Sequence, residues 1–177
     1  MSVGLRKGTV LLLPYQKSWE QEFETEKAVL LRAFPHIFER IEHIGSTSVV
    51  GLSAKPIIDI DATVQTFDVI DQHFIKKLEV LGYECIPERM FDERKFFPKG
   101  PAANRTHHLN IVLKSGQKIQ QDIAFRDMLR HNSHAKGLYQ KQKEQLASQY
   151  SHDRAKYTKE KERIIQKLLG IGPVKGR

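Results

Sequence analysis

Residues 43–64 read HIGSTSVVGLSAKPIIDIDATV, and two short patterns in this stretch decide the fold. The first is a small-residue turn, Gly45 to Ser48, which follows a predicted strand over residues 40–44. The second is a predicted strand over residues 57–64, in which apolar side chains alternate with Asp59 and Asp61. A turn of small polar residues followed by an acidic strand is therefore the central feature of the predicted fold.

Outward from this stretch, hydrophobic periodicity predicts alternating helices and strands, and then helices alone. Ser18, followed by Trp19-Glu20-Gln21, is expected to cap the first helix in a capping box. The predicted helices cover 18–34, 67–81, 120–130, 135–150 and 153–169, and the further strands cover 9–13, 83–86, 95–97 and 107–113. This order predicts one α+β domain over residues 1–177, with a helical C-terminal region at about 117–170.

Length and composition exclude several classes of protein. The chain has 177 residues, of which 40% are hydrophobic and 28% charged, as in an ordinary globular domain. Its single cysteine, Cys85, excludes an intrachain disulfide framework and a thiolate-rich zinc site. No apolar stretch approaches the roughly 20 residues of a membrane span, and the N-terminus has no small-residue cleavage site. We therefore expect a cytoplasmic protein with no membrane partner.

Charge is distributed unevenly along the chain. Residues 1–113 carry 14 basic and 15 acidic side chains, a net charge of −1, whereas residues 114–177 carry 15 basic and 6 acidic side chains, a net charge of +9. A basic half next to a near-neutral half favours anionic partners such as phosphates, nucleotides or nucleic acid. Lysines on a solvated helical face would produce the same count.

Asp59 and Asp61 are the candidate catalytic and metal-binding residues. Alternation places both on the same face of a strand, about 7 Å apart along the backbone. Two neighbouring carboxylates repel each other, and Mg²⁺ bound by carboxylate and phosphate oxygens would relieve that repulsion. The alternative is an exposed strand face with two solvated aspartates.

The turn before the acidic strand is the candidate phosphate site. Its free backbone N–H groups and hydroxyls have the chemistry to hold phosphate oxygens. Lys55 adds a cation directly before the strand. The residues assigned to phosphate binding here are Gly45, Ser46, Thr47, Ser48 and Lys55.

Three cations interrupt the apolar faces of the predicted C-terminal helices. Arg126, Lys143 and Lys161 each fall among core-facing positions. Because an unpaired buried charge is costly, they need partners, which a bound phosphate or the acid pair would supply. The alternatives are side chains that extend their charged ends into water, or structural ion pairs with Asp127 or Asp122.

Three motifs in order resemble the GrpB family, which is similar to the nucleotidyltransferase superfamily. They cover roughly residues 9–168. The motifs are His43-Ile44-Gly45-Ser46-Thr47-Ser48 with Ala54-Lys55-Pro56-Ile57-Ile58-Asp59-Ile60, then His108-Leu109-Asn110-Ile111-Val112, then Ala124-Phe125-Arg126-Asp127-Met128-Leu129-Arg130, followed by Tyr139, Lys143, Tyr157 and Lys161. The resemblance implies a nucleotidyltransferase-like mixed sheet with flanking helices.

The resemblance also implies further site residues. Active nucleotidyltransferases usually carry a third carboxylate on a later strand, where this chain has His108 and Asn110. The family pattern has histidine at the position of Asn110, and asparagine brings neither charge nor a titratable proton. Tyr139 is a further candidate, and so is His43, which precedes the Gly-Ser turn and would either contact a nucleotide or simply pack. In some family members the domain is fused to dephospho-CoA kinase, which suggests a link to coenzyme A metabolism.

Three functions follow from these features. The leading hypothesis is a protein that binds a nucleotide or a phosphorylated small molecule with Mg²⁺ and transfers a nucleotidyl group to an unknown acceptor. The alternative is a non-catalytic module that binds a phosphate-bearing ligand through a degenerate active site. RNA binding by the basic half is the least favoured, because no aromatic stacking platform or RNA motif accompanies the charge.

Overall fold

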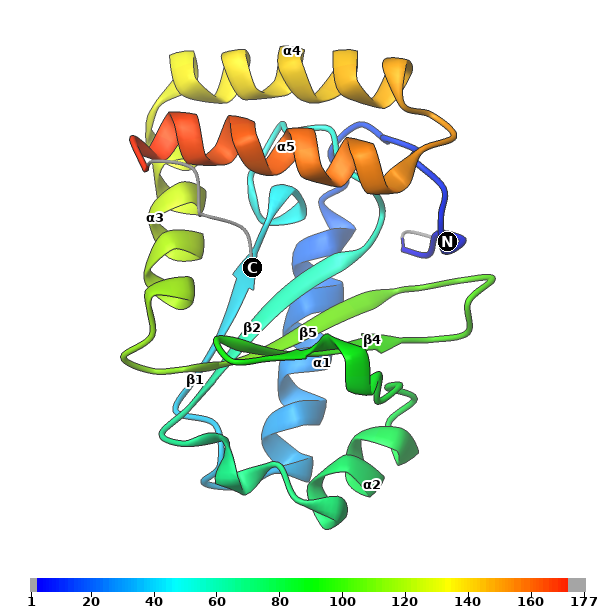
Figure 1. The fold of residues 1–177 in the computed structure, drawn as a ribbon, viewed down its shortest axis with the longest axis vertical. Helices are drawn as coiled ribbons and strands as arrows, with labels where there is room; N and C mark the ends of the chain where they lie inside the picture. The colour runs from blue at the N-terminus through cyan, green and yellow to red at the C-terminus, as the bar shows by residue number, and fades with distance from the viewer. Residues whose placement is uncertain (1–2, 172–177) are drawn as a thin grey trace.

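A computed structural model describes residues 3–171 as a sheet with helices on both faces (Figure 1). The helices are α1 (Ser18–Ala33), α2 (Gln72–Val80), α3 (Gln117–His131), α4 (Ser133–Gln149) and α5 (Arg154–Leu169). The strands are β1 (Arg40–Ile44), β2 (Ile58–Val64), β3 (Met90–Phe91), β4 (Arg94–Lys99) and β5 (His107–Leu113). Short 3-10 turns cover Ser46–Ser48, Phe67–Val69 and Pro87–Arg89.

The sheet is mixed, with strand order β1-β2-β5-β4-β3. β2 and β5 are parallel, and the other neighbouring pairs are antiparallel. The register places Asp59 opposite His108 and Asp61 opposite Asn110. Side chains directly opposite each other on neighbouring strands share a face, so these four polar residues lie on one side of the sheet.

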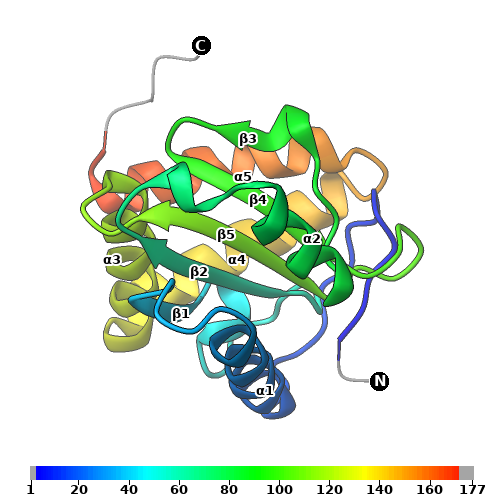
Figure 2. The ribbon, with the colours of Figure 1, turned by 90° about the horizontal axis from the view of Figure 1, so that it is seen from below.

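The other side of the sheet carries the larger hydrophobic core. Ile58, Ile60 and Ala62 of β2 pack there against Trp19 and Leu30 of α1, and all five are fully buried. Figure 2 shows α1 on this side of the sheet, opposite α4 and α5. The alternation of aliphatic and acidic residues along β2 thus separates an apolar face from the candidate site.

Helices α3, α4 and α5 form the C-terminal region and pack around the turn that follows β1. Val49 and Leu52 after the turn lie in one buried cluster with Phe125, Leu129 and Tyr139. In Figure 1, α4 and α5 run side by side across one end of the molecule. The expected α+β architecture with a helical C-terminal region is therefore confirmed.

Local differences from the sequence prediction have clear causes. Ser18 is the first residue of α1 and not its cap; Lys17 holds the cap position and makes no side-chain hydrogen bond there. The helix expected over 67–81 begins at Gln72, because Asp71 accepts a hydrogen bond from the Phe74 N–H and caps it. The expected strands over 9–13 and 83–86 are reduced to single bridges at Leu13 and Tyr83.

No helix within residues 3–171 combines the length and the apolar character needed to cross a membrane.

Candidate functional site

Asp59 and Asp61 share a face of β2 but differ in their access to solvent. The Asp59 side chain is 37% exposed, whereas Asp61 is completely buried. Of the two predicted catalytic carboxylates, Asp59 is the one that can meet a ligand directly.

Asp59 is held as a carboxylate by its neighbours. His108 Nδ1 lies 2.9 Å from Asp59 Oδ1. Burial acts to raise the pKa of Asp59, but the hydrogen bond from His108 and the charges of His108, Lys161 and Lys55 outweigh it and lower that pKa to about 2. Asp59 therefore stays ionised throughout the physiological range and is oriented by a neighbouring imidazole.

Asp61 lies in a polar cluster with Asn110 of β5 and Asp122 of α3. Asn110 Nδ2 donates to Asp61 Oδ1 over 2.9 Å. Asp61 Oδ2 and Asn110 Oδ1 are buried without a hydrogen-bond partner among the residues described. Burial and the nearby charge of Asp122 raise the pKa of Asp61 well above its usual value, and Lys118 only partly opposes them. A protonated Asp61 would turn its Oδ2 into a donor, with Asp122 as the neighbouring acceptor.

The turn after β1 approaches Asp59 closely. Gly45 has φ +70°, and a Cβ on it would lie 2.8 Å from Asp59 Oδ2. Ser46 Oγ lies 3.5 Å from the hydroxyl of Tyr139 on α4, and Ser48 Oγ donates to Gly45 O. Only glycine combines this backbone conformation with this contact, so the turn and the acidic strand form one site.

The three lysines predicted to bind phosphate have different environments. Lys143 is fully buried, and its Nζ donates to the carbonyl of Ser53. Lys55 is half-buried, with Nζ 5.0 Å from the ring centroid of Tyr157. Lys161 lies near both Asp59 and Lys55, since its charge acts on each of them.

The pKa values of these lysines diverge accordingly. Burial, followed by the charge of Lys161, lowers the pKa of Lys143 to about 7. Burial and the charges of Lys161 and Arg154 lower the pKa of Lys55 to about 7 as well. The pKa of Lys161 moves the other way. Tyr139 raises it, burial acts to lower it, and Tyr157 and Asp59 raise it further, so that the net shift is upward. Lys161 is thus the fixed positive charge of the site.

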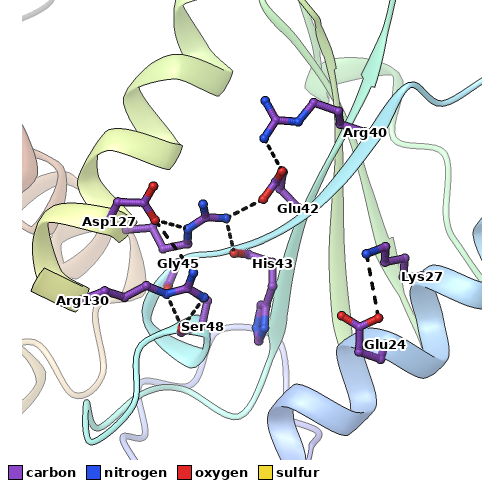
Figure 3. Close-up of polar contacts among 10 residues, drawn as sticks. Glu24, Lys27, Arg40, Glu42, His43, Gly45, Ser48, Asp127 and Arg130 are labelled. Carbon is purple, nitrogen blue, oxygen red and sulfur yellow. Dashed lines mark hydrogen bonds and ion pairs between the residues drawn. The ribbon is translucent and has the colours of Figure 1, made fainter.

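Arg126 does not join the Asp59 cluster, contrary to the expectation from its place on α3. Its Nη1 donates to Glu42 Oε2 over 2.6 Å and to His43 O, and its Nε donates to Asp127 Oδ1. Figure 3 labels these three partners, Glu42, His43 and Asp127. Beside it, Arg130 donates to Ser48 O. The ion pair with Asp127 that the sequence left open as an alternative is therefore formed, and Arg126 holds β1 to α3.

His43 and Thr47 contact each other behind the turn, and the charge of Asp59 acts on His43. His43 stands opposite Ile60 in the strand register and therefore on the apolar face. Its ring stacks on Phe23 with centroids 4.7 Å apart, and its Nε2 lies 2.9 Å from Thr47 Oγ1. Burial lowers the pKa of His43 to about 4, so its ring is neutral at physiological pH. It packs on Phe23 and holds Thr47 of the turn by a hydrogen bond.

Two residues of the cluster were not predicted as site residues: Arg154, and Tyr157, which was noted only as part of the family motif. Arg154 lies near both Asp59 and Lys55, and the Tyr157 ring lies beneath Lys55. Arg154, Tyr157 and Lys161 are spaced i, i+3 and i+7 on one helix face, and this periodicity was the available signal.

No group of three or more histidine, cysteine, aspartate or glutamate side chains within residues 3–171 is arranged to hold a metal ion. Asp59 supplies one ionised carboxylate, and Asp61 lies behind it and is closed off. A divalent cation at this site would therefore have to take its other ligands from water and from the bound molecule.

A mixed sheet whose acidic strand faces three helices, with a glycine-serine turn against the acid, defines an α+β protein with a polar site on one sheet face. The chain belongs to the GrpB protein family, whose model matches residues 9–170. It is 30% identical over 170 residues to the glutamate-rich protein GrpB of Alkalihalophilus pseudofirmus, covering 94% of this chain and 98% of that one.

The fold is also that of a solved relative. The crystal structure of the conserved protein GrpB from Enterococcus faecalis matches with a TM-score of 0.81 and 34% identity, covering 90% of this chain and 98% of that chain. A shorter match, 34% identical over 87 residues, is to dephospho-CoA kinase of Mycobacterium bovis, covering 48% of this chain and 21% of the kinase.

Proposed function

We propose that this protein binds a phosphorylated small molecule, with a nucleotide as the first candidate, in the cluster around Asp59. One observation carries the proposal. The charges of Lys55, Lys161 and Arg154 act on this carboxylate, and none of the three side chains makes a hydrogen bond or an ion pair with another side chain or backbone group in the range 3–171. Crowded cations without acidic partners are the electrostatic signature of a site for a multiply charged anion.

The residues of the proposed site would have different roles in binding. Lys161 keeps its charge at any physiological pH, and Lys55 gains charge when an anion arrives, because a nearby negative charge raises the pKa of an amine. Ser46 and Tyr139 place hydroxyl groups at the edge of the cluster. These groups suit phosphate oxygens, which accept several hydrogen bonds at once.

Nucleotidyl transfer with Mg²⁺ is the second candidate, and the ionised, accessible carboxylate of Asp59 favours it. Mg²⁺ is commonly bound through one or two carboxylates together with substrate phosphates. In this site Asp59 would hold the ion, which would act as a Lewis acid on a phosphoryl oxygen. Asp59, fixed by His108, would keep its charge and position, and Lys161 would neutralise charge that develops on the phosphate.

The alternative is a binding module without turnover, and Asn110 in place of a third acid supports it. The partial match to dephospho-CoA kinase adds coenzyme A precursors to the ligands worth testing.

The test is a thermal-shift panel of inorganic phosphate, ATP, phosphopantetheine and dephospho-CoA, each with and without Mg²⁺. A ligand present at about 100 times its Kd should raise the melting temperature by about 5–10 °C. The Lys161→Met variant should lose most of that shift. The matched control is Lys159→Met, which removes an exposed lysine from the same helix and should keep the shift.

Two results would contradict the proposal. A shift of the same size in Lys161→Met and the wild type would place the anion elsewhere on the basic half. The absence of a shift with every ligand would exclude a phosphate site of useful affinity. A shift that requires Mg²⁺ would indicate that the metal takes part in binding and would justify a turnover assay with that nucleotide, which alone distinguishes transfer from binding.

A further inference from the structure

Strands β3 and β4 carry aromatic rings and arginines on the same face of the sheet as the proposed phosphate site. Phe96 of β4 stands opposite Asn110 of β5, which in turn stands opposite Asp61 of β2. Arg94 comes two residues before Phe96 on β4 and stands opposite Phe91 of β3, so all of these side chains share one face. The polar face of the sheet therefore continues beyond β5 as a mixture of rings and cations.

The rings and guanidinium groups of this region contact one another. Arg94 Cζ lies 5.6 Å from the ring centroid of Phe91 and 5.7 Å from that of Phe96. Arg89 Cζ lies 5.3 Å from the Phe96 centroid. Neither guanidinium makes a hydrogen bond or an ion pair with another residue in the described range 3–171, and Phe91 is 51% exposed. These four residues, Arg89, Phe91, Arg94 and Phe96, are called the stacking surface below.

The stacking surface adjoins the cluster around Asp59. The ring of His108, which is bonded to Asp59, lies 5.1 Å from the ring of Phe96 between centroids. Arg154 of α5 is close to both regions: burial and then the charge of Arg89 lower its pKa, whereas Asp59 acts to raise it. Asp59 and Phe96 are two strands and two residues apart, which sets their Cα atoms roughly 12 Å apart.

We propose that the stacking surface binds the base of a nucleotide whose phosphates lie at Lys161 and Arg154. The inference rests on the proposed function, because it assigns the other end of the same ligand. Every base has a π face, which stacks on aromatic rings and on the planar guanidinium of arginine. An exposed ring next to guanidinium groups without acidic partners offers such faces, within the reach of a nucleotide from its phosphates to its base.

The sequence showed no stacking platform, because these rings and guanidinium groups meet only when β3 pairs with β4. A purely structural role is the competing explanation, since β3 has two residues and cation–π contacts would help to hold it on β4. The two explanations differ in their consequence for binding. A structural role predicts that removing the Phe91 ring changes stability alone, whereas a base site predicts that it changes the affinity for nucleotides and not for phosphates.

The experiment compares ATP with tripolyphosphate, which has the same phosphate chain and no base, by isothermal titration calorimetry in one Mg²⁺ buffer. The wild-type protein should bind ATP at least about fivefold more tightly, as expected for one stacked base. Phe91→Ala should remove most of this preference and leave the affinity for tripolyphosphate unchanged. Phe91→Tyr keeps the ring and should keep the preference. The matched control is Val80→Ala, which truncates an exposed apolar side chain of α2 and should behave as the wild type.

Phe91→Trp gives a direct readout of stacking. Trp19 is the only tryptophan of the chain and is fully buried, so an indole introduced at position 91 reports separately from the stacking surface. ATP should quench the added fluorescence, because a base stacked on an indole quenches it, and tripolyphosphate should not. An added fluorescence that ATP leaves unchanged at saturation would contradict the inference.

The affinities separate this inference from the proposed function. Equal affinities of the wild-type protein for ATP and tripolyphosphate, or a preference for ATP that Phe91→Ala retains, would overturn the base site and leave the phosphate site in place. If the wild-type protein binds neither ligand, the proposed function fails and the base site fails with it. The comparison of the two ligands uses the wild-type protein, so it does not depend on the folding of any variant.

Discussion

His108 Nδ1 lies 2.9 Å from Asp59 Oδ1, and the two residues stand opposite each other on the parallel strands β5 and β2. The pair joins two segments that the sequence singled out separately, 49 residues apart. The pair keeps Asp59 ionised, and the charges of Lys161 and Lys55 act in the same direction. The site is therefore positive around one fixed negative charge, and its ligand preference depends on how that charge is used.

Replacing Asp59 with asparagine distinguishes direct phosphate binding from binding through a metal. If phosphate meets the cations directly, the Asp59→Asn variant should bind inorganic phosphate about fivefold more tightly, because a like charge about 7 Å away costs about 1 kcal/mol at intermediate dielectric. If Mg²⁺ bridges Asp59 and a nucleotide, the variant should lose Mg²⁺-dependent binding. Isothermal titration with phosphate, and with ATP and Mg²⁺, measures both.

The matched control for this substitution is Glu79→Gln, which removes an exposed carboxylate from α2. It should leave both affinities unchanged. Equal behaviour of Asp59→Asn and wild type in both titrations would show that this carboxylate does not face the ligand.

The low pKa of Lys143 predicts that stability rises with pH. In the unfolded chain a lysine titrates near 10.4, whereas Lys143 in the folded protein titrates at about 7. Between these values the unfolded chain binds more protons, so the free energy of unfolding should increase as pH rises from about 7 to 10. Urea unfolding of the wild type and Lys143→Met across this range measures the slope, which should be smaller in the variant.

Lys55 adds to the same slope, so it should be reduced and not abolished in Lys143→Met. A control variant, Lys159→Met, should keep the wild-type dependence. A wild-type stability that is flat or falls over this interval would mean that neither lysine is neutral in the folded protein.

How well the sequence predicted the structure depended on whether the deciding contacts are local. The bounds of β1 and β5 were predicted correctly because turn residues end both strands, at Gly45 after β1 and at Ser115-Gly116 after β5. The strand predicted over 83–86 is absent because Tyr83 makes only one bridge, to Lys99, and no local pattern in the sequence indicates that partner. The prediction that Ser18 caps α1 was wrong because Lys17, the residue before it, already has helical backbone angles.

The candidate site shows the same limit. Alternation correctly placed Asp59 and Asp61 on one face, but only the packing of α3 buries Asp61 next to Asp122. Arg126 had the pattern of an anion ligand, yet its partner Glu42 lies on a strand at the far end of the chain. Periodicity shows which side chains face inward, and it does not show which inward charge meets which.

Gly45→Ala tests the contact between the turn and Asp59. Gly45 has φ +70° and ψ −169°, a combination essentially restricted to glycine, and the added Cβ would lie 2.8 Å from Asp59 Oδ2. The variant should lose about 1–3 kcal/mol of unfolding free energy and weaken phosphate binding, because either the turn or the carboxylate must move. Chemical denaturation and phosphate titration measure the two effects.

Gly170→Ala is the control for backbone strain alone. Gly170 has φ +66° in the left-handed cap of α5, and a Cβ there would meet nothing within 4 Å. It should cost about 1 kcal/mol and leave phosphate binding unchanged. If Gly45→Ala behaves like this control, the close approach to Asp59 has no role in the site.

Arg126→Met tests the structural role of the Arg126–Glu42 pair. The guanidinium is 10% exposed and bridges Glu42, His43 O and Asp127, so its removal should cost about 2–3 kcal/mol, as expected for hydrogen bonds to charged groups. Because Arg126 lies apart from the Asp59 cluster, the thermal shift produced by a phosphorylated ligand should keep its wild-type size. If the variant folds but its melting temperature no longer rises with the ligand, Arg126 takes part in binding after all.

Acid titration gives this prediction a second readout. Burial acts to raise the pKa of Glu42, but Arg126 and Arg40 outweigh it, and the pKa values of Glu42 and Asp127 are both lowered in the folded protein. A lowered carboxyl pKa contributes stability that is fully present above the unfolded value, near 4, and is lost as pH falls through the folded value. The wild type should therefore lose more stability than Arg126→Met between about pH 5 and pH 3. Parallel curves for the two proteins would show that the guanidinium does not stabilise these carboxylates.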